Sequence, residues 1–162
     1  MNIVICGLGY VGATIAACLL KDGHSVTGID PDPRKRADMK AGRSPVSEPG
    51  VTELLTQGKA AGRLRIVEAV GETLNEAHTV IVCVGTPPTQ AGGLDLSQVV
   101  AVTEELGAAI AARPDTAAPI LMVIRSTLTP GAMDETIVPA LTKAAGAPPG
   151  DRYEIAFNPE FL

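Results

Sequence analysis

A glycine-rich hexapeptide near the N-terminus constrains the fold of this chain more than any other feature. The pattern GLGYVG, residues 7–12, follows a short β-rich run and opens an Ala-rich segment of helical character. In such a pattern Gly7 permits a tight turn, Gly9 lets the backbone approach a pyrophosphate, and Gly12 lets helix and strand pack closely. The first N–H groups of the helix are unpaired and attract phosphate oxygens. The pattern therefore predicts a strand, a phosphate-binding loop and a helix, in that order.

An acidic residue stands where a dinucleotide-binding fold needs one. Asp30 ends the next β-rich run, 18 residues after Gly12. A carboxylate at this place can accept hydrogen bonds from both hydroxyls of the adenosine ribose, and it repels a 2′-phosphate. The two features predict NAD, in preference to NADP, as the cofactor. The competing interpretation is a glycine-rich turn followed by an ordinary loop Asp. Lys35 either supports the adenine side of this site or is solvated.

Short β-rich runs and helix-like segments alternate along the whole chain. This alternation predicts right-handed βαβ units, and hence a parallel sheet covered by helices on both faces. Six strands fit the doubly wound order 3-2-1-4-5-6, so we predict an α/β fold, a Rossmann-type domain over residues 1–162. Asp95 is expected to cap the long helix, with Gln98 placed for a capping box, and Thr129-Pro130 to open the last helix. The predicted strands are 2–6, 25–29, 64–67, 79–84, 120–124 and 153–157, and the other predicted helices are 10–22, 33–41, 51–59, 70–77 and 95–113.

Composition and charge narrow the class of function. Hydrophobic residues make up 46% of the chain and aromatic residues only 2%, which favours a core of Val, Ile, Leu and Ala as in buried parallel sheets. A net charge of −5 offers no electrostatic footprint for nucleic acid, and the basic cluster at residues 34–36 is typical of a solvated helix start. Apolar stretches fall far short of the roughly 20 residues that span a bilayer. We expect a cytoplasmic protein with reduced thiols that binds neither nucleic acid nor membrane, and no residue spacing indicates a metal site.

Polar residues follow the last three predicted strands, at the point where each strand ends. These segments are residues 85–88 (Gly-Thr-Pro-Pro), 125–127 (Arg-Ser-Thr) and 158–160 (Asn-Pro-Glu). In open α/β sheets, ligands bind beyond the carboxyl ends of the strands, so the three segments are expected to share one crevice. Their Thr and Ser side chains either contact the ligand or cap the next helix. Glu160 is either an acid–base group or a surface carboxylate.

Five motifs occur in the same order and spacing as in a known family. They are GLGYVG at 7–12, PVSEPG at 45–50, VGTP at 84–87, RST at 125–127 and NPEFL at 158–162. On these motifs the chain resembles the UDP-glucose/GDP-mannose dehydrogenase family from its first residue to its last. The arginine before Ser-Thr, and the Leu-Thr-Pro-Gly that follows, are most similar to the GDP-mannose 6-dehydrogenase branch.

The resemblance implies an NAD-dependent, two-step oxidation of the sugar CH₂OH of a nucleotide-sugar substrate to a carboxylate. In the family a cysteine of a later domain captures the aldehyde, and the resulting thioester is hydrolysed. The match places that cysteine beyond Leu162, with the central and C-terminal substrate domains, so this chain is expected to bind cofactor without turning over. The parent enzyme is expected to be a homo-oligomer. Carried over by motif, Gly7, Gly9, Tyr10, Val11, Gly12, Asp30, Lys35, Thr86 and Thr127 bind NAD, Glu160 is catalytic, and Glu160, Phe161 and Leu162 contact the substrate.

Two other classes of protein share the glycine loop and the acid. A β-hydroxyacid dehydrogenase of the 6-phosphogluconate type has a cofactor domain of similar order, but the Asn-Pro-Glu-Phe-Leu ending argues against it. A non-catalytic, NAD-sensing regulatory domain has no reason to place polar groups at three successive strand ends.

Overall fold

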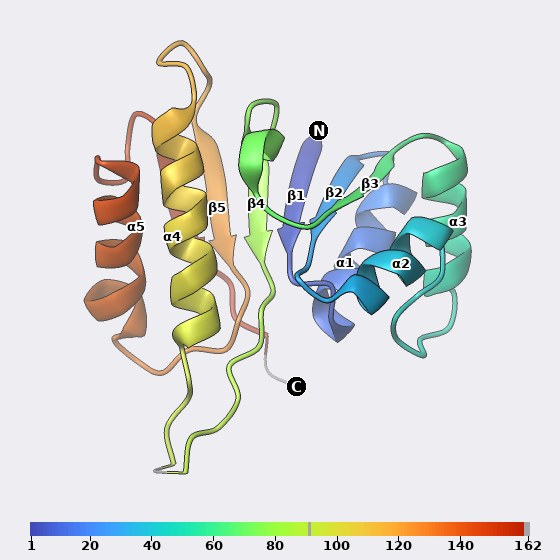
Figure 1. Cartoon of the computed structure of the whole chain (residues 1–162), viewed down its shortest axis with the longest axis horizontal. Helices are drawn as coiled ribbons and strands as arrows, with labels where there is room; N and C mark the ends of the chain where they lie inside the picture. The colour runs from blue at the N-terminus through green and yellow to red at the C-terminus, as the bar shows by residue number, and fades with distance from the viewer. Residues whose placement is uncertain (91, 161–162) are drawn as a thin grey trace.

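The computed structural model describes residues 1–90 and 92–160, and in these residues six strands form one sheet (Figure 1). All neighbouring strands are parallel and their order is β3-β2-β1-β4-β5-β6, which confirms the predicted doubly wound fold. The strands are β1 (Asn2–Cys6), β2 (Ser25–Ile29), β3 (Leu64–Val67), β4 (Thr79–Val82), β5 (Ile120–Ile124) and β6 (Tyr153–Phe157).

Helices accompany both halves of the sheet. Helices α1 and α3 pack on each other beside β1, β2 and β3, and α4 and α5 pack on each other beside β4, β5 and β6 (Figure 1). A short 3₁₀ turn, η1, links β3 to β4, and a π-helical turn, η2, leads into α5. The bounds are α1 (Tyr10–Lys21), α2 (Pro33–Ala41), α3 (Val51–Ala60), η1 (Gly71–Leu74), α4 (Ser97–Ala112), η2 (Met133–Ile137) and α5 (Val138–Ala145).

The central strand β1 is buried on both faces. Ile3 and Ile5 belong to the apolar cluster that includes α1 and α3, whereas Val4 and Cys6 belong to the cluster that includes α4 and α5. Successive side chains of a strand point to opposite faces, so a strand covered on both sides must be apolar at nearly every position. This is why β1 reads as a continuous apolar run rather than as an alternating one.

Several elements differ from the sequence prediction, two of them because of glycines. Residues 70–77 form only the η1 turn, since Gly71 has φ +45°, outside the helical region. The last helix begins at Met133 rather than at Thr129-Pro130, because Gly131 with φ +84° interrupts it. Strand β4 stops at Val82, two residues earlier than predicted.

The start of α4 corrects the predicted capping box. Leu96 occupies the N-cap position, and Asp95 instead accepts a hydrogen bond from the Ser97 N–H at 2.9 Å. Gln98 is therefore the second residue of the helix, not the third, and it cannot close a capping box. Its side chain is free for another role.

The topology fixes where a ligand can bind. The strand order reverses between β1 and β4, and the carboxyl ends of these two strands open at the same edge of the sheet as the first turns of α1 and α4. Among the described residues, no helix is long and apolar enough to cross a membrane.

Candidate dinucleotide-binding site

A cleft of about 750 Å³ opens at the point where the strand order reverses. The glycine loop, the ends of β2, β4 and β5, one face of α4 and Glu160 line it. Of the residues proposed from the sequence, Gly12 packs behind the glycine loop rather than lining the cleft, and Phe161 and Leu162 lie outside the described residues. The cleft is lined by the others, namely Gly7, Gly9, Tyr10, Val11, Asp30, Lys35, Thr86, Thr127 and Glu160.

The three glycines of the loop lack side chains for different reasons. A Cβ on Gly7, whose φ is +95°, would lie 2.6 Å from the Cys83 carbonyl oxygen, and one on Gly12 would overlap the Gly7 carbonyl oxygen. Gly9 is different, because no described atom lies within 4 Å of the place where its Cβ would stand. The space over Gly9 belongs to the cleft. Packing thus explains Gly7 and Gly12, whereas packing does not require a glycine at position 9.

The first turn of α1 has the features of an anion-binding helix N-terminus. Helix α1 begins directly after Gly9, and in the described chain no side chain caps it and no acid stands in its first turn. Its N–H groups therefore keep their hydrogen-bonding capacity and their partial positive charge. This arrangement can hold a phosphate or pyrophosphate beside Gly9.

Asp30 supports the glycine loop as well as facing the cleft. Its carboxyl is only 3% exposed, and Oδ2 accepts from the Leu8 N–H at 2.8 Å while Oδ1 accepts from the Asp32 N–H at 2.8 Å. Lys35 Nζ lies 3.4 Å from Oδ2. Oδ2 thus accepts from both Leu8 and Lys35, whereas Oδ1 accepts from Asp32 and keeps a lone pair that a ligand hydroxyl can use. The bond to Leu8 joins the glycine loop to Asp30, a contact that sequence spacing did not reveal.

The basic cluster at residues 34–36 is not a single solvated face. Arg34 is 92% exposed, as a solvated side chain should be. Arg36 turns inward instead: Nη1 donates to the carbonyls of Asp30 at 2.8 Å and Pro31 at 2.6 Å, and Nη2 lies 3.1 Å from Glu68 Oε2. Arg36 therefore braces the turn that carries Asp30, and Arg34 forms its ion pair with Asp32 at the exposed surface.

The ends of β5 and β6 are joined by side chains that were predicted to gather here. Thr127 Oγ1 donates to the Glu160 carbonyl at 2.9 Å, and Ser126 Oγ donates to the Val84 carbonyl at 2.7 Å. Neither hydroxyl caps the next helix, so the capping alternative is wrong for both. Arg125, which was not singled out as a site residue, donates to the Asn158 side chain and to the Glu160 carboxylate.

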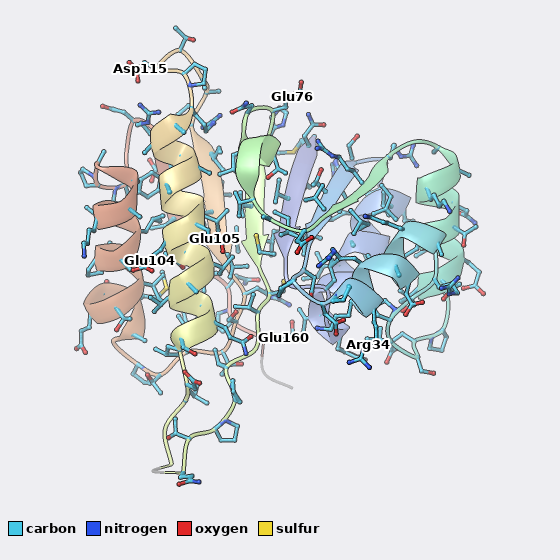
Figure 2. All side chains as sticks on the ribbon, viewed as in Figure 1. Arg34, Glu76, Glu104, Glu105, Asp115 and Glu160 are labelled. Atoms are coloured by element: carbon cyan, nitrogen blue, oxygen red, sulfur yellow. The ribbon has the colours of Figure 1, made fainter. Side chains whose placement is uncertain are left out.

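Arg125 holds Glu160 by main-chain and side-chain contacts together. The Glu160 N–H donates to the Arg125 carbonyl at 3.3 Å, in addition to the ion pair between the two side chains. The Glu160 side chain is 29% exposed and the Arg125 side chain 24%, so the pair is partly withdrawn from solvent at the rim of the cleft. Figure 2 shows Glu160 close to the carboxyl end of the sheet. A charged group directly after an apolar strand was the available signal for Arg125.

Tyr10 connects the glycine loop to the segment between α2 and α3. Its hydroxyl donates to the Glu48 carboxylate, which lies in the PVSEPG motif. This hydrogen bond is the main cause that raises the pKa of Tyr10 above its ordinary value, followed by burial and then by the charges of Glu48 and Glu160. The contact places the PVSEPG motif beside the entrance of the cleft.

One face of α4 forms a wall of the cleft that the sequence prediction missed. Residues 98, 101, 102 and 105 line it, and this is the i, i+3, i+4, i+7 spacing of a single helical stripe. The stripe runs Gln98, Ala101, Val102 and Glu105, polar at its ends and apolar between them. The helical spacing of these residues is the sequence signal for this wall, but the sequence prediction assigns Gln98 to a capping box.

The thiols of the cleft are poor nucleophiles. Burial raises the pKa of Cys83 to about 12, with Glu160 adding to the effect and Arg125 opposing it. Burial also raises the pKa of Cys6, at the end of β1, far above the ordinary range. A thiol in this state is protonated at neutral pH, whereas nucleophilic attack needs the thiolate. Among the described residues no group of three or more His, Cys, Asp or Glu is placed to hold a metal ion.

We expect N-ethylmaleimide at pH 7.5 to add a single label to the folded chain, at Cys18. Cys18 is exposed on α1, whereas Cys6 is buried and Cys83 half-buried, and burial raises the pKa of both thiols. Intact mass measures the number of labels. The Cys18→Ser variant should take none until urea unfolds it, and then two. Labelling of Cys83 in the folded Cys18→Ser variant would contradict the raised pKa.

Comparison with known proteins places this geometry in a family. Residues 1–162 match the family model described as "UDP-glucose/GDP-mannose dehydrogenase family, NAD binding domain". A GDP-mannose 6-dehydrogenase of Pseudomonas putida is 40% identical over all of this chain, which spans 36% of that protein. A UDP-glucose 6-dehydrogenase of Haloferax volcanii is 37% identical with the same coverage. The crystal structure of a ternary complex of GDP-mannose dehydrogenase from Pseudomonas aeruginosa superposes with a TM-score of 0.93 at 37% identity, covering 100% of this chain and 36% of that one.

Proposed function

Because the chain belongs to the UDP-glucose/GDP-mannose dehydrogenase family and matches its NAD-binding domain, we propose that it holds NAD for the oxidation of a nucleotide sugar at the sugar CH₂OH. The observation that carries the proposal is the cleft at the strand reversal, where an open glycine, an uncapped helix end and a buried acid converge. Membership of this family also sets aside the 6-phosphogluconate-type dehydrogenase and the regulatory sensor.

The residues present fit an NAD molecule along the length of the cleft. Gly9 and Val11 would hold the pyrophosphate, where the first N–H groups of α1 have no side-chain cap. Asp30 and Lys35 would hold the adenosine ribose, with the remaining lone pair of Asp30 Oδ1 available to a ribose hydroxyl. Gly7 and Gly12 shape the loop and make no contact of their own through side chains.

The nicotinamide side of the cofactor lies toward the ends of β4, β5 and β6. Thr86 and Thr127 line that part of the cleft, and Glu160 stands at its rim. NAD, when bound, supplies the hydride acceptor for the oxidation. The protein's own contribution at this end is a carboxylate that Arg125 orients through an ion pair.

The identity of the substrate is proposed from the relatives. Six GDP-mannose 6-dehydrogenases from Pseudomonas and Azotobacter species are 37–40% identical to this chain, and the ternary complex that superposes at TM-score 0.93 is a GDP-mannose dehydrogenase. A UDP-glucose 6-dehydrogenase is also 37% identical. GDP-mannose is therefore the substrate we favour, and UDP-glucose is the second candidate.

The whole enzyme needs more than the described residues. The chain spans 36% of the Pseudomonas putida relative, and neither thiol of the cleft has the low pKa of a nucleophile. We propose that the nucleophilic cysteine comes from another domain, and that the chain on its own binds NAD without oxidising a sugar. Assembly of the complete enzyme as a homo-oligomer belongs to the same proposal.

Cofactor choice tests the proposed function directly. In calorimetric titrations of the chain we expect NAD to bind roughly tenfold to a hundredfold more tightly than NADP, because a 2′-phosphate would meet the Asp30 carboxylate. Asp30→Asn should reduce the difference in affinity between NAD and NADP, while its amide oxygen still accepts one backbone N–H. Asp30→Ala should narrow it too, but the Leu8 N–H then loses its partner and the chain should melt at a lower temperature.

The control for this titration is Asp38→Asn. Asp38 is an α2 acid that pairs with Arg43, outside the cleft, so its removal should leave the NAD preference unchanged. NADP binding as tight as NAD in the unmodified chain would refute the assignment of Asp30 to the ribose.

A further inference from the structure

Four carboxylates line the cleft, and one of them has no cationic partner. An anionic cofactor is repelled by an acid, so each acid in this cleft needs a compensating group. For three of them the compensating group is a neighbouring cation, whereas Glu105 makes no ion pair with any residue in the described part of the chain. The three pairs are Asp30–Lys35, Glu68–Arg36 and Glu160–Arg125.

The position of Glu105 on α4 directs it at the cleft. It is the last member of the stripe that begins with Gln98, and it lies one turn beyond Ala101 and Val102. Figure 2 shows Glu105 on the side of α4 that faces β4, and Glu104 on the side toward α5. The Glu105 charge also reaches Cys6 at the end of β1, where it contributes to the raised pKa of that thiol.

The order of the other groups along the cleft indicates what lies beside Glu105. With the pyrophosphate over Gly9 and the ribose against Asp30, the base must lie beyond the ribose, between the turn at Pro31 and the α4 stripe. Ala101 and Val102 give this part of the cleft an apolar wall, which suits the flat face of a purine. Glu105 is exposed at the edge of this wall, where its carboxylate can accept from a hydrogen-bond donor on the base.

We propose that Glu105 accepts a hydrogen bond from the 6-amino group of adenine and makes the cleft select adenine over a base with an oxygen at that position. The amino group is the one N–H donor of adenine once the ring is attached to ribose, so it matches an acceptor-only side chain. An oxygen at the same position would face the carboxylate with lone pairs, and the one N–H donor of such a base, at N1, lies at the neighbouring ring position, so the base would be bound less tightly. The inference rests on the proposed NAD function and identifies the Glu105 carboxylate as the group that recognises adenine.

The test compares NAD with nicotinamide hypoxanthine dinucleotide, which carries an oxygen in place of the amino group. In titrations of the chain we expect NAD to bind roughly 2- to 10-fold more tightly than the hypoxanthine analogue, as expected when one hydrogen bond at an exposed carboxylate is lost. Glu105→Ala and Glu105→Gln should bring the ratio of the two dissociation constants close to one. Alanine has no side-chain hydrogen-bonding group, and a glutamine amide can either donate or accept.

Glu104→Gln is the matched control, because it removes the same charge from the adjacent residue outside the stripe and should keep the parent ratio. Both glutamates are exposed, so the variants should melt like the parent chain. A general charge effect would tighten both dinucleotides equally in Glu105→Gln, and an unchanged ratio there would overturn the inference while leaving NAD binding intact. If the parent chain fails to bind NAD at all, the proposed function falls and the inference falls with it.

Discussion

Gly12→Ala should abolish NAD binding by destabilising the fold, whereas Gly9→Ala should abolish it while leaving the fold intact. A Cβ on Gly12 would overlap the Gly7 carbonyl oxygen and lie 3.0 Å from the Gly7 carbonyl carbon. Both are backbone atoms and cannot swing aside. Overpacking typically costs about 1–3 kcal/mol, and a clash with fixed backbone belongs at or above the upper end. Because a domain is stable by only about 5–15 kcal/mol, the loss should appear as a large drop in melting temperature.

At Gly9 the same methyl group meets no described atom within 4 Å. Gly9 has φ −76°, which any residue adopts, so alanine there should leave the melting temperature unchanged or raise it slightly by restricting the unfolded chain. The methyl group nevertheless occupies the space in which the pyrophosphate must approach the backbone. Thermal unfolding and NAD titration of the two variants separate the effects. Normal NAD binding by Gly9→Ala would show that the open space beside Gly9 is not the phosphate-binding site.

The sheet order could be predicted from the sequence because its causes are local. Each strand is a short apolar run bounded by turn residues, and consecutive parallel strands follow a right-handed crossover. The η1 segment and the start of the last helix were predicted wrongly because each depends on a single backbone angle. Gly71 and Gly131 stand at positive φ, and nothing in the sequence tells a glycine inside a helix from one that interrupts it.

The sequence predicted where the candidate site residues lie in the fold, but not which side chains contact one another there. The acid at residue 30 was assigned to the ribose from its spacing, yet its bond to the Leu8 N–H spans 22 residues and depends on the packing of β1 against β2. The same holds for Arg36, which pairs with Glu68 from a segment 32 residues away. Both interactions arise only when the strands are brought together. They also explain why a cluster of three basic residues after β2 does not form a single basic surface.

Glu160→Gln in the complete enzyme should slow steady-state turnover by about 10²–10⁴-fold, the usual contribution of a general base. The carboxylate is fixed at the rim of the cleft by Arg125 and by the Thr127 hydroxyl, which binds its main-chain carbonyl. A carboxylate fixed at this place can order and deprotonate the water that hydrolyses a thioester. Glutamine keeps the size of the side chain and much of its hydrogen bonding, but it cannot take a proton.

The control variant is Glu154→Gln, an exposed acid on β6 outside the cleft, which should turn over at the parent rate. The Glu160→Gln enzyme should bind NAD as tightly as the parent, because Glu160 stands apart from the phosphate and ribose contacts.

The shape of the time course then assigns the role of Glu160. A base needed only for hydrolysis leaves hydride transfer intact, so the first turnover should release a rapid burst of NADH and then stall. Intact mass should detect a covalent enzyme–sugar adduct on the stalled protein. A base needed for the oxidation itself would remove the burst and leave no adduct. Parent turnover without an adduct would instead make Glu160 a surface residue, and its pair with Arg125 would then serve only to join β5 to β6.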